Sequence, residues 1–239
     1  MRAKYHRPGD ASERHPDQRI VGLPEGDRQC PACGQPLYGW LQLDSRAGPT
    51  LLERCESCRL GLAAGLGRGD IANELLADAR RLPDGGLELR VANRDSWQAR
   101  LGGLNWAALE TGRGLYPTPR ALALLAEKAD LSLDRIDCPR WGTSQVWMWE
   151  TIVNAFTFQH NFALRMRAGL TRASGASASR VKGAIDAVVT VLATPLVLVV
   201  ALPLELIAAL AGKGGVLVAR AMRAEAPQSS EEEYEKVDQ

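Results

Sequence analysis

Cys30-Pro31-Ala32-Cys33 and Cys55-Glu56-Ser57-Cys58 are two C-x-x-C pairs with 21 residues between them. A C-x-x-C turn aims two sulfur atoms at one centre, and two such turns complete a tetrahedron around Zn²⁺. Cys30, Cys33, Cys55 and Cys58 are therefore the candidate ligands of a structural zinc ion. Because four thiolates leave no open position for water or substrate, we expect the metal to fold this segment and not to catalyse a reaction. A pair of disulfides and four unrelated buried thiols are the alternative interpretations.

The residues between the two pairs have the pattern of a β-hairpin. Residues 37–43 and 50–54 are typical of short strands, and the loop between them is rich in turn-forming residues. Gly34 follows the first pair and can adopt the positive φ that a tight knuckle needs. Arg59 follows the second pair, which predicts a less regular turn. We expect a zinc ribbon over residues 29–60.

The whole chain has the composition of a globular protein, with biased ends. Of its 239 residues, 46% are hydrophobic and 24% charged, and the net charge of +1 argues against general nucleic-acid binding. Residues 1–28 mix charges with Pro and Gly, and residues 224–239 are acidic, so we expect both to be disordered. No apolar signal-peptide core follows Met1, which predicts a cytoplasmic protein with reduced thiols.

The middle of the chain predicts a linker followed by helices and strands. Residues 61–70 are glycine-rich but lack the preceding buried strand and βαβ unit of a nucleotide-binding turn, so we expect a linker there. Asp70 is a suitable N-cap for a helix over 71–82, and the alternation in 87–91 predicts a half-buried strand. Further on, the pattern predicts a helix over 118–129 and a strand over 131–138.

Several short motifs follow one another in an order shared with a known family. They are Leu82-Pro83-Asp84-Gly85-Gly86 before a strand ending Val91-Ala92-Asn93, then Leu115-Tyr116-Pro117-Thr118-Pro119 before a helix, and finally the strand-like Lys213–Arg220. This order resembles the C-terminal half of class I S-adenosylmethionine-dependent methyltransferases, over residues 70–140 and 212–223. The resemblance implies that the family's fifth, seventh and sixth strands are neighbours in one sheet. Some relatives also carry an N-terminal zinc ribbon.

The family's cofactor-binding half has no counterpart in this chain. In the family, the first strand, its glycine-rich turn and an acidic residue after the second strand hold the cofactor. Only 12 residues separate Cys58 from Ile71, whereas four strands with their crossovers need about 100. No catalytic or cofactor-binding residue can be carried over, and S-adenosylmethionine is not an expected cofactor.

The fold class that follows is α+β. A small zinc ribbon precedes a truncated Rossmann-like methyltransferase remnant over 71–223, with about three strands, helices, and an apolar helical hairpin over 144–168 and 184–211. The fifth strand would lose its neighbour, so we expect the ribbon or a second subunit to cover its edge.

The C-terminal region is apolar and basic. Ala187–Leu204 contains 18 residues without a formal charge, which just reaches the length of a membrane-spanning helix. Pro195 and Pro203 would interrupt an isolated helix, and Asp186 and Glu205 bracket the run, which suits a bent or re-entrant segment. Residues 141–223 hold eight basic against three acidic residues.

Two interpretations of this region stay open. In one, residues 141–211 hold the protein on the inner face of the membrane as a peripheral or re-entrant segment, with aromatic rings at headgroup depth. In the other, the helices pack as soluble core over the small sheet.

The titratable residues form no catalytic pattern. His6, His15 and His160 are scattered, and Cys138 has no histidine near it, so His160 is expected to be a packed residue and Cys138 a small buried one. The leading hypothesis is a non-catalytic interaction or scaffold module with a protein partner or a second copy of itself.

Two other functions remain alternatives. One is a methyltransferase completed by a partner chain. The other is a zinc-ribbon nucleic-acid adaptor, suggested by Arg46, Arg54 and Arg59. Acidic residues neutralise these arginines locally, so no nucleic acid is expected as a partner. The neutralising residues are Asp44, Glu53 and Glu56.

Overall fold

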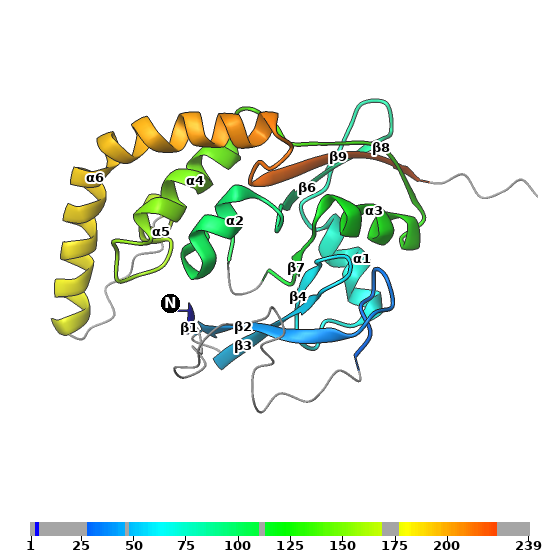
Figure 1. Cartoon of the computed structure of the whole chain (residues 1–239), viewed down its shortest axis with the longest axis horizontal. Coiled ribbons are helices and arrows are strands. Elements are labelled where there is room, and N and C mark those ends of the chain that lie inside the picture. The colour runs from blue at the N-terminus through cyan, green and yellow to red at the C-terminus, as the bar shows by residue number, and fades with distance from the viewer. Residues whose placement is uncertain (1–2, 5–27, 46–47, 110–112, 169–176, 224–239) are drawn as a thin grey trace, which may run out of the picture.

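The computed structural model describes residues 3–4, 28–45, 48–109, 113–168 and 177–223 (Figure 1). These residues form two small antiparallel sheets, six α-helices and one 3-10 helix, so the predicted α+β class is confirmed. The tail 224–239 lies outside the described residues, as does most of 1–28. Within that arm, Ala3–Lys4 form strand β1 and Arg28 is ion-paired with Glu53 at 2.6 Å, which corrects the expectation that all of 1–28 is disordered.

The first sheet has the strand order β1-β2-β3-β4-β7 and contains the expected hairpin. β2 (Leu37–Ser45) pairs with β3 (Gly48–Cys55), with Leu37 opposite Cys55. β4 (Gly61–Ala63) then adds to β3, and β7 (Leu115–Tyr116) adds to β4. The hairpin is therefore extended by a strand from much later in the chain.

β4 corrects the expectation that residues 61–70 are a linker. Leu62 is fully buried, and a Cβ on Gly61 would lie 2.7 Å from the ring of Trp40. Glycine lets the β4 backbone approach the Trp40 ring. At this position the glycine serves close packing, not flexibility.

The second sheet has the strand order β5-β6-β9-β8. β6 (Leu87–Ala92) and β8 (Leu131–Asp137) flank β9 (Val216–Arg223), which is antiparallel to both. The predicted strands over 87–91 and 131–138 are present. β5 (Arg80–Arg81) pairs with Leu87 and Glu88 of β6, so a short strand of this chain covers the start of the edge for which the ribbon or a second subunit was expected.

α1 and α3 lie between the two sheets (Figure 1). α1 (Arg68–Leu76) begins and ends earlier than the predicted 71–82 helix, because Gly67 is its N-cap and Asp70 lies at the third helical position, accepting the Gly67 N–H at 3.2 Å. α3 (Pro119–Lys128) is as predicted, with Thr118 as the N-cap. Between them, α2 (Trp97–Gly102) continues into the 3-10 helix Gly103–Asn105.

The apolar C-terminal helices differ from the expected pair over 144–168 and 184–211. α4 (Thr143–Val153) and α5 (Phe162–Arg167) are separate helices, because the chain turns at Asn161, which has a φ of 53°. α6 (Ser177–Leu210) is longer than expected and continues through Pro195 and Pro203. Figure 1 shows α6 bent along the outside of α4 and α5. A bend is expected there, because each proline inside a helix removes one backbone hydrogen bond.

One hydrophobic core joins the ribbon to the rest of the fold. Side chains from both cysteine knuckles share it with α1, α3, β6 and β9. Its fully buried members include Leu60, Leu62, Leu89 and Leu122. The ribbon is therefore packed into the body of the protein.

Candidate metal centre

The four candidate ligands lie on two loops of the first sheet. Cys30 and Cys33 precede β2, while Cys55 ends β3 and Cys58 precedes β4. The first knuckle is closed by a 2.8 Å hydrogen bond from Gly34 N–H to the Cys30 carbonyl, and Gly34 has a φ of 76°, as its position predicts.

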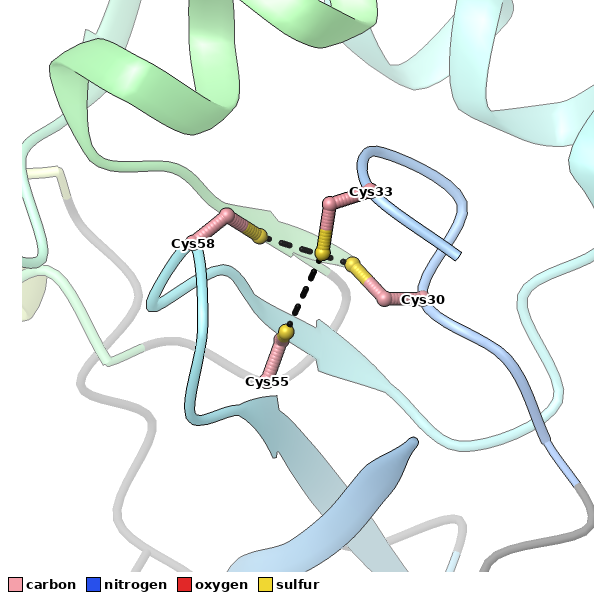
Figure 2. Close-up of side chains that lie close together, drawn as sticks. All are labelled: Cys30, Cys33, Cys55 and Cys58. Carbon is pink, nitrogen blue, oxygen red and sulfur yellow. Dashed lines mark hydrogen bonds between the residues drawn. The ribbon is translucent and has the colours of Figure 1, made fainter. Parts of the chain in front are cut away.

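The four sulfur atoms converge on one point (Figure 2). All lie within 4.8 Å of one another, with 3.5 Å between the Cys30 and Cys58 Sγ atoms and 3.4 Å between those of Cys33 and Cys55. Four sulfurs at about 2.3 Å from one zinc ion lie about 3.8 Å apart. The arrangement is compatible with zinc binding. The five cysteines of the chain are free thiols in this structure, so the disulfide interpretation is not supported.

The cluster is largely buried, and its sulfur atoms contact one another in two pairs. Cys30, Cys55 and Cys58 are each 1% exposed, and Cys33 is half-buried. The hydrogen bond from the Cys58 thiol lowers the pKa of Cys30 to about 5 and raises that of Cys58. Burial raises the pKa of Cys55. A divalent cation favours the thiolate form of each ligand, so binding it would release protons.

α3 fixes both knuckles from one side. The Thr118 hydroxyl donates to the Cys58 carbonyl at 2.8 Å and accepts the Ala121 N–H at 3.2 Å, so one side chain caps the helix and holds the second knuckle. At the other end of the helix, Lys128 Nζ donates to the Pro31 carbonyl at 2.8 Å.

Arg59 gives the second knuckle its turn. It has a φ of 61°, which is costly for a residue with a side chain, and its guanidinium is ion-paired with Asp95 at 2.7 Å. Its carbonyl accepts a hydrogen bond from Arg94, whose guanidinium carbon lies 4.3 Å from the centre of the Trp40 ring. Burial lowers the pKa of Arg94 to about 10. The less regular turn predicted after Cys58 is thus held by its neighbours.

The other sequence candidates do not join this cluster. His160 bonds to the Trp106 carbonyl at 3.1 Å, and burial lowers its pKa to about 4, so it is a neutral, packed residue. Cys138 is half-buried beside the Gly214 carbonyl, and burial raises its pKa. His6 and His15 lie outside the described residues.

Two of the three arginines that suggested nucleic-acid contact are ion-paired. Arg54 is ion-paired with Glu56 at 2.5 Å, and Arg59 with Asp95. Arg46 lies outside the described residues.

Sequence reasoning missed the buried carboxylates of the C-terminal helices. Glu150, Asp186 and Glu205 are each fully buried. Burial raises the pKa of Glu150 to about 7. A signal for Asp186 and Glu205 was present, since they bracket the uncharged run 187–204, but the residues that face them come from distant parts of the chain.

Comparison with known proteins gives no relative: no family model, curated protein or solved structure matches the chain.

Proposed function

We propose that this protein is a non-catalytic, zinc-stabilised interaction or scaffold module with the architecture of a methyltransferase that lacks its cofactor half. The strand order β6-β9-β8, with β9 antiparallel to both neighbours, supports this origin. It is the order that the methyltransferase resemblance implies for the family's last three strands.

The main support for the proposal is the secondary structure that residues 59–86 form. In the methyltransferase family, the strands that bind the cofactor come before the fifth strand. Here that stretch forms β4 of the ribbon sheet, the nine-residue α1 and the two-residue β5. These described elements contain no βαβ unit, so the proposed function is binding and not methyl transfer.

Zinc is the metal we propose for the cysteine cluster. Four sulfur donors without nitrogen or oxygen suit Zn²⁺, and a set of four cysteines leaves no open coordination position, which suits a structural site. The ion would tie both knuckles to the core that they share with α1 and α3. The module would then present its surface to a protein partner or to a second copy of the chain, in the cytoplasm.

The test is calorimetric titration of S-adenosylmethionine and S-adenosylhomocysteine into the zinc-loaded full chain, with an active methyltransferase as the positive control. We expect no binding at millimolar cofactor. Micromolar binding would overturn the proposal, because it would require a cofactor pocket built from residues 59–86.

A methyltransferase completed by a partner chain is the second candidate. β5 pairs with two of the six residues of β6, at the edge where the family places its fourth strand. A partner strand could extend this edge. This candidate predicts a complex that binds S-adenosylmethionine although neither chain does so by itself.

A further inference from the structure

α6 carries a long apolar face that the rest of the described structure leaves uncovered. Val181–Leu210 is 30 residues long, and only 17% of its most apolar 18-residue stretch is buried. The most exposed side chains lie around Pro195, where Leu192 is 74%, Leu196 73% and Val199 72% exposed. The same stripe includes further exposed residues at helical spacing, namely Val181, Ile185, Val188, Val191, Ile207 and Leu210. A continuous apolar stripe of this length exceeds what a soluble monomer normally exposes.

The two acids of this segment face the protein. Asp186 accepts the backbone N–H groups of Phe158 and Gln159 at 2.7 and 3.1 Å. Glu205 accepts the Gly215 N–H at 2.8 Å and a hydrogen bond from Gln98 at 2.7 Å, and Ser144 also donates to it. Because both carboxylates are bonded inside, the outer face of α6 keeps no acidic charge.

The fold argues against a single crossing of a membrane by α6. β8 precedes the C-terminal helices and β9 follows them, and these two strands are paired in one sheet. The chain therefore leaves and returns on the same side. A second crossing would need another helix of about 20 residues, but the other described helices between β8 and β9 have 11 and 6 residues.

Exposed aromatic residues lie close in sequence to the residues that bond the two ends of α6, at Asp186 and at Glu205, and exposed cations occur in the same part of the chain. Trp141 is 69% exposed and lies three residues before Ser144, which bonds Glu205; Phe156 and Phe158 are exposed beside the Asp186 contact. Among the described residues between Cys138 and Gly215, the acids are all buried, whereas Arg140, Arg167 and Lys182 are exposed. This charge pattern complements an anionic lipid surface, with the rings at headgroup depth.

We infer that α6 lies in the surface of an anionic phospholipid bilayer, with its Leu192, Leu196 and Val199 face among the acyl chains and the metal centre in the water. The inference rests on the proposed scaffold function, to which it adds the surface on which the scaffold works. Binding combines burial of apolar side chains with attraction of the exposed cations to lipid phosphates.

The test is flotation of the full chain with vesicles of equal parts phosphatidylcholine and phosphatidylglycerol, and with phosphatidylcholine vesicles. We expect flotation with the anionic vesicles, and binding at least about tenfold weaker for the double variant Leu192→Glu/Leu196→Glu. The matched control Leu101→Glu/Met222→Glu changes two exposed apolar residues outside α6 and should float like the wild type. Circular dichroism of each variant establishes that it is folded.

Three results would overturn the inference. They are failure of the wild type to float, equal flotation of the α6 double variant, and a dimer in vesicle-free buffer that this variant dissociates, which would make α6 a subunit interface.

The substitution Arg140→Gln/Lys182→Gln should remove the preference for anionic vesicles. The two proposals fail independently. If the protein does not float, the titration can still show that it does not bind S-adenosylmethionine. Micromolar binding of S-adenosylmethionine would overturn the scaffold proposal, whatever the result of flotation.

Discussion

The substitution Glu150→Gln should raise the free energy of unfolding, relative to the wild type, by more at pH 8 than at pH 5. Glu150 lies on α4, fully buried, and accepts the Ala163 N–H at 3.2 Å. Its Oε2 atom has no hydrogen-bond partner among the described residues. Burial therefore raises the pKa of this carboxyl group from 4.5 to about 7.

The sign of the effect follows from proton linkage. Below pH 4.5 both the folded and the unfolded chain hold the proton, and Glu150 contributes no pH dependence. Between pH 4.5 and about 7 the unfolded chain releases the proton while the folded chain keeps it, so the free energy of unfolding falls as the pH rises. At 1.36 kcal/mol per pKa unit, the carboxyl group costs about 3 kcal/mol at pH 8 and about 1 kcal/mol at pH 5.

Urea unfolding followed by tryptophan fluorescence measures this difference. From pH 5 to pH 8, the stability of Glu150→Gln minus that of the wild type should rise by about 2 kcal/mol. The exposed Glu127 on α3 provides the control, since Glu127→Gln also replaces one carboxyl group by an amide. All other side chains are the same in the three proteins, so their contributions cancel in the comparison. A difference for Glu150→Gln that does not change with pH would refute the reasoning.

Three further perturbations test the metal centre and the packing of Gly215 against Gln98. Thr118→Val removes the hydroxyl that caps α3 and holds Cys58, and should lower the free energy of urea unfolding by about 1–3 kcal/mol; the exposed Thr143→Val is the control, and equal effects would contradict the assigned role. Removal of the metal with a chelator should melt the whole shared core in one transition of the circular dichroism signal, and loss of the hairpin signal by itself would contradict this. Gly215→Ala should lower the melting temperature by several degrees, because its Cβ would lie 2.2 Å from Gln98 Nε2, and an unchanged melting temperature would disagree with the packing.

The hairpin, the two cysteine pairs and the main strands could be predicted because their signals are local. The two C-x-x-C pairs and the turn-rich loop between them specify β2 and β3, and Thr118-Pro119 specifies the start of α3. The alternation in β6 was readable in the same way. Each cysteine pair, the hairpin loop, the start of α3 and the alternation in β6 depends on residues within a few positions of one another.

The elements that could not be predicted depend on distant contacts. β4 is three residues long and is defined by its pairing with β3 and β7. The break between α4 and α5 is stabilised by Asn154 and Asn161, whose side chains bond each other and distant backbone carbonyls. The inward orientation of Glu205 needs Gln98 and Gly215 as partners. Propensity and periodicity do not register such pairings.

X-ray absorption at the zinc edge of the purified full chain, with the metal content determined on the same sample, tests the central claim that a four-thiolate zinc ion holds this fold together. The account predicts one zinc ion per chain with four sulfur ligands at about 2.3 Å. A nitrogen or oxygen ligand in the first shell, or a folded protein that contains no metal, would contradict it.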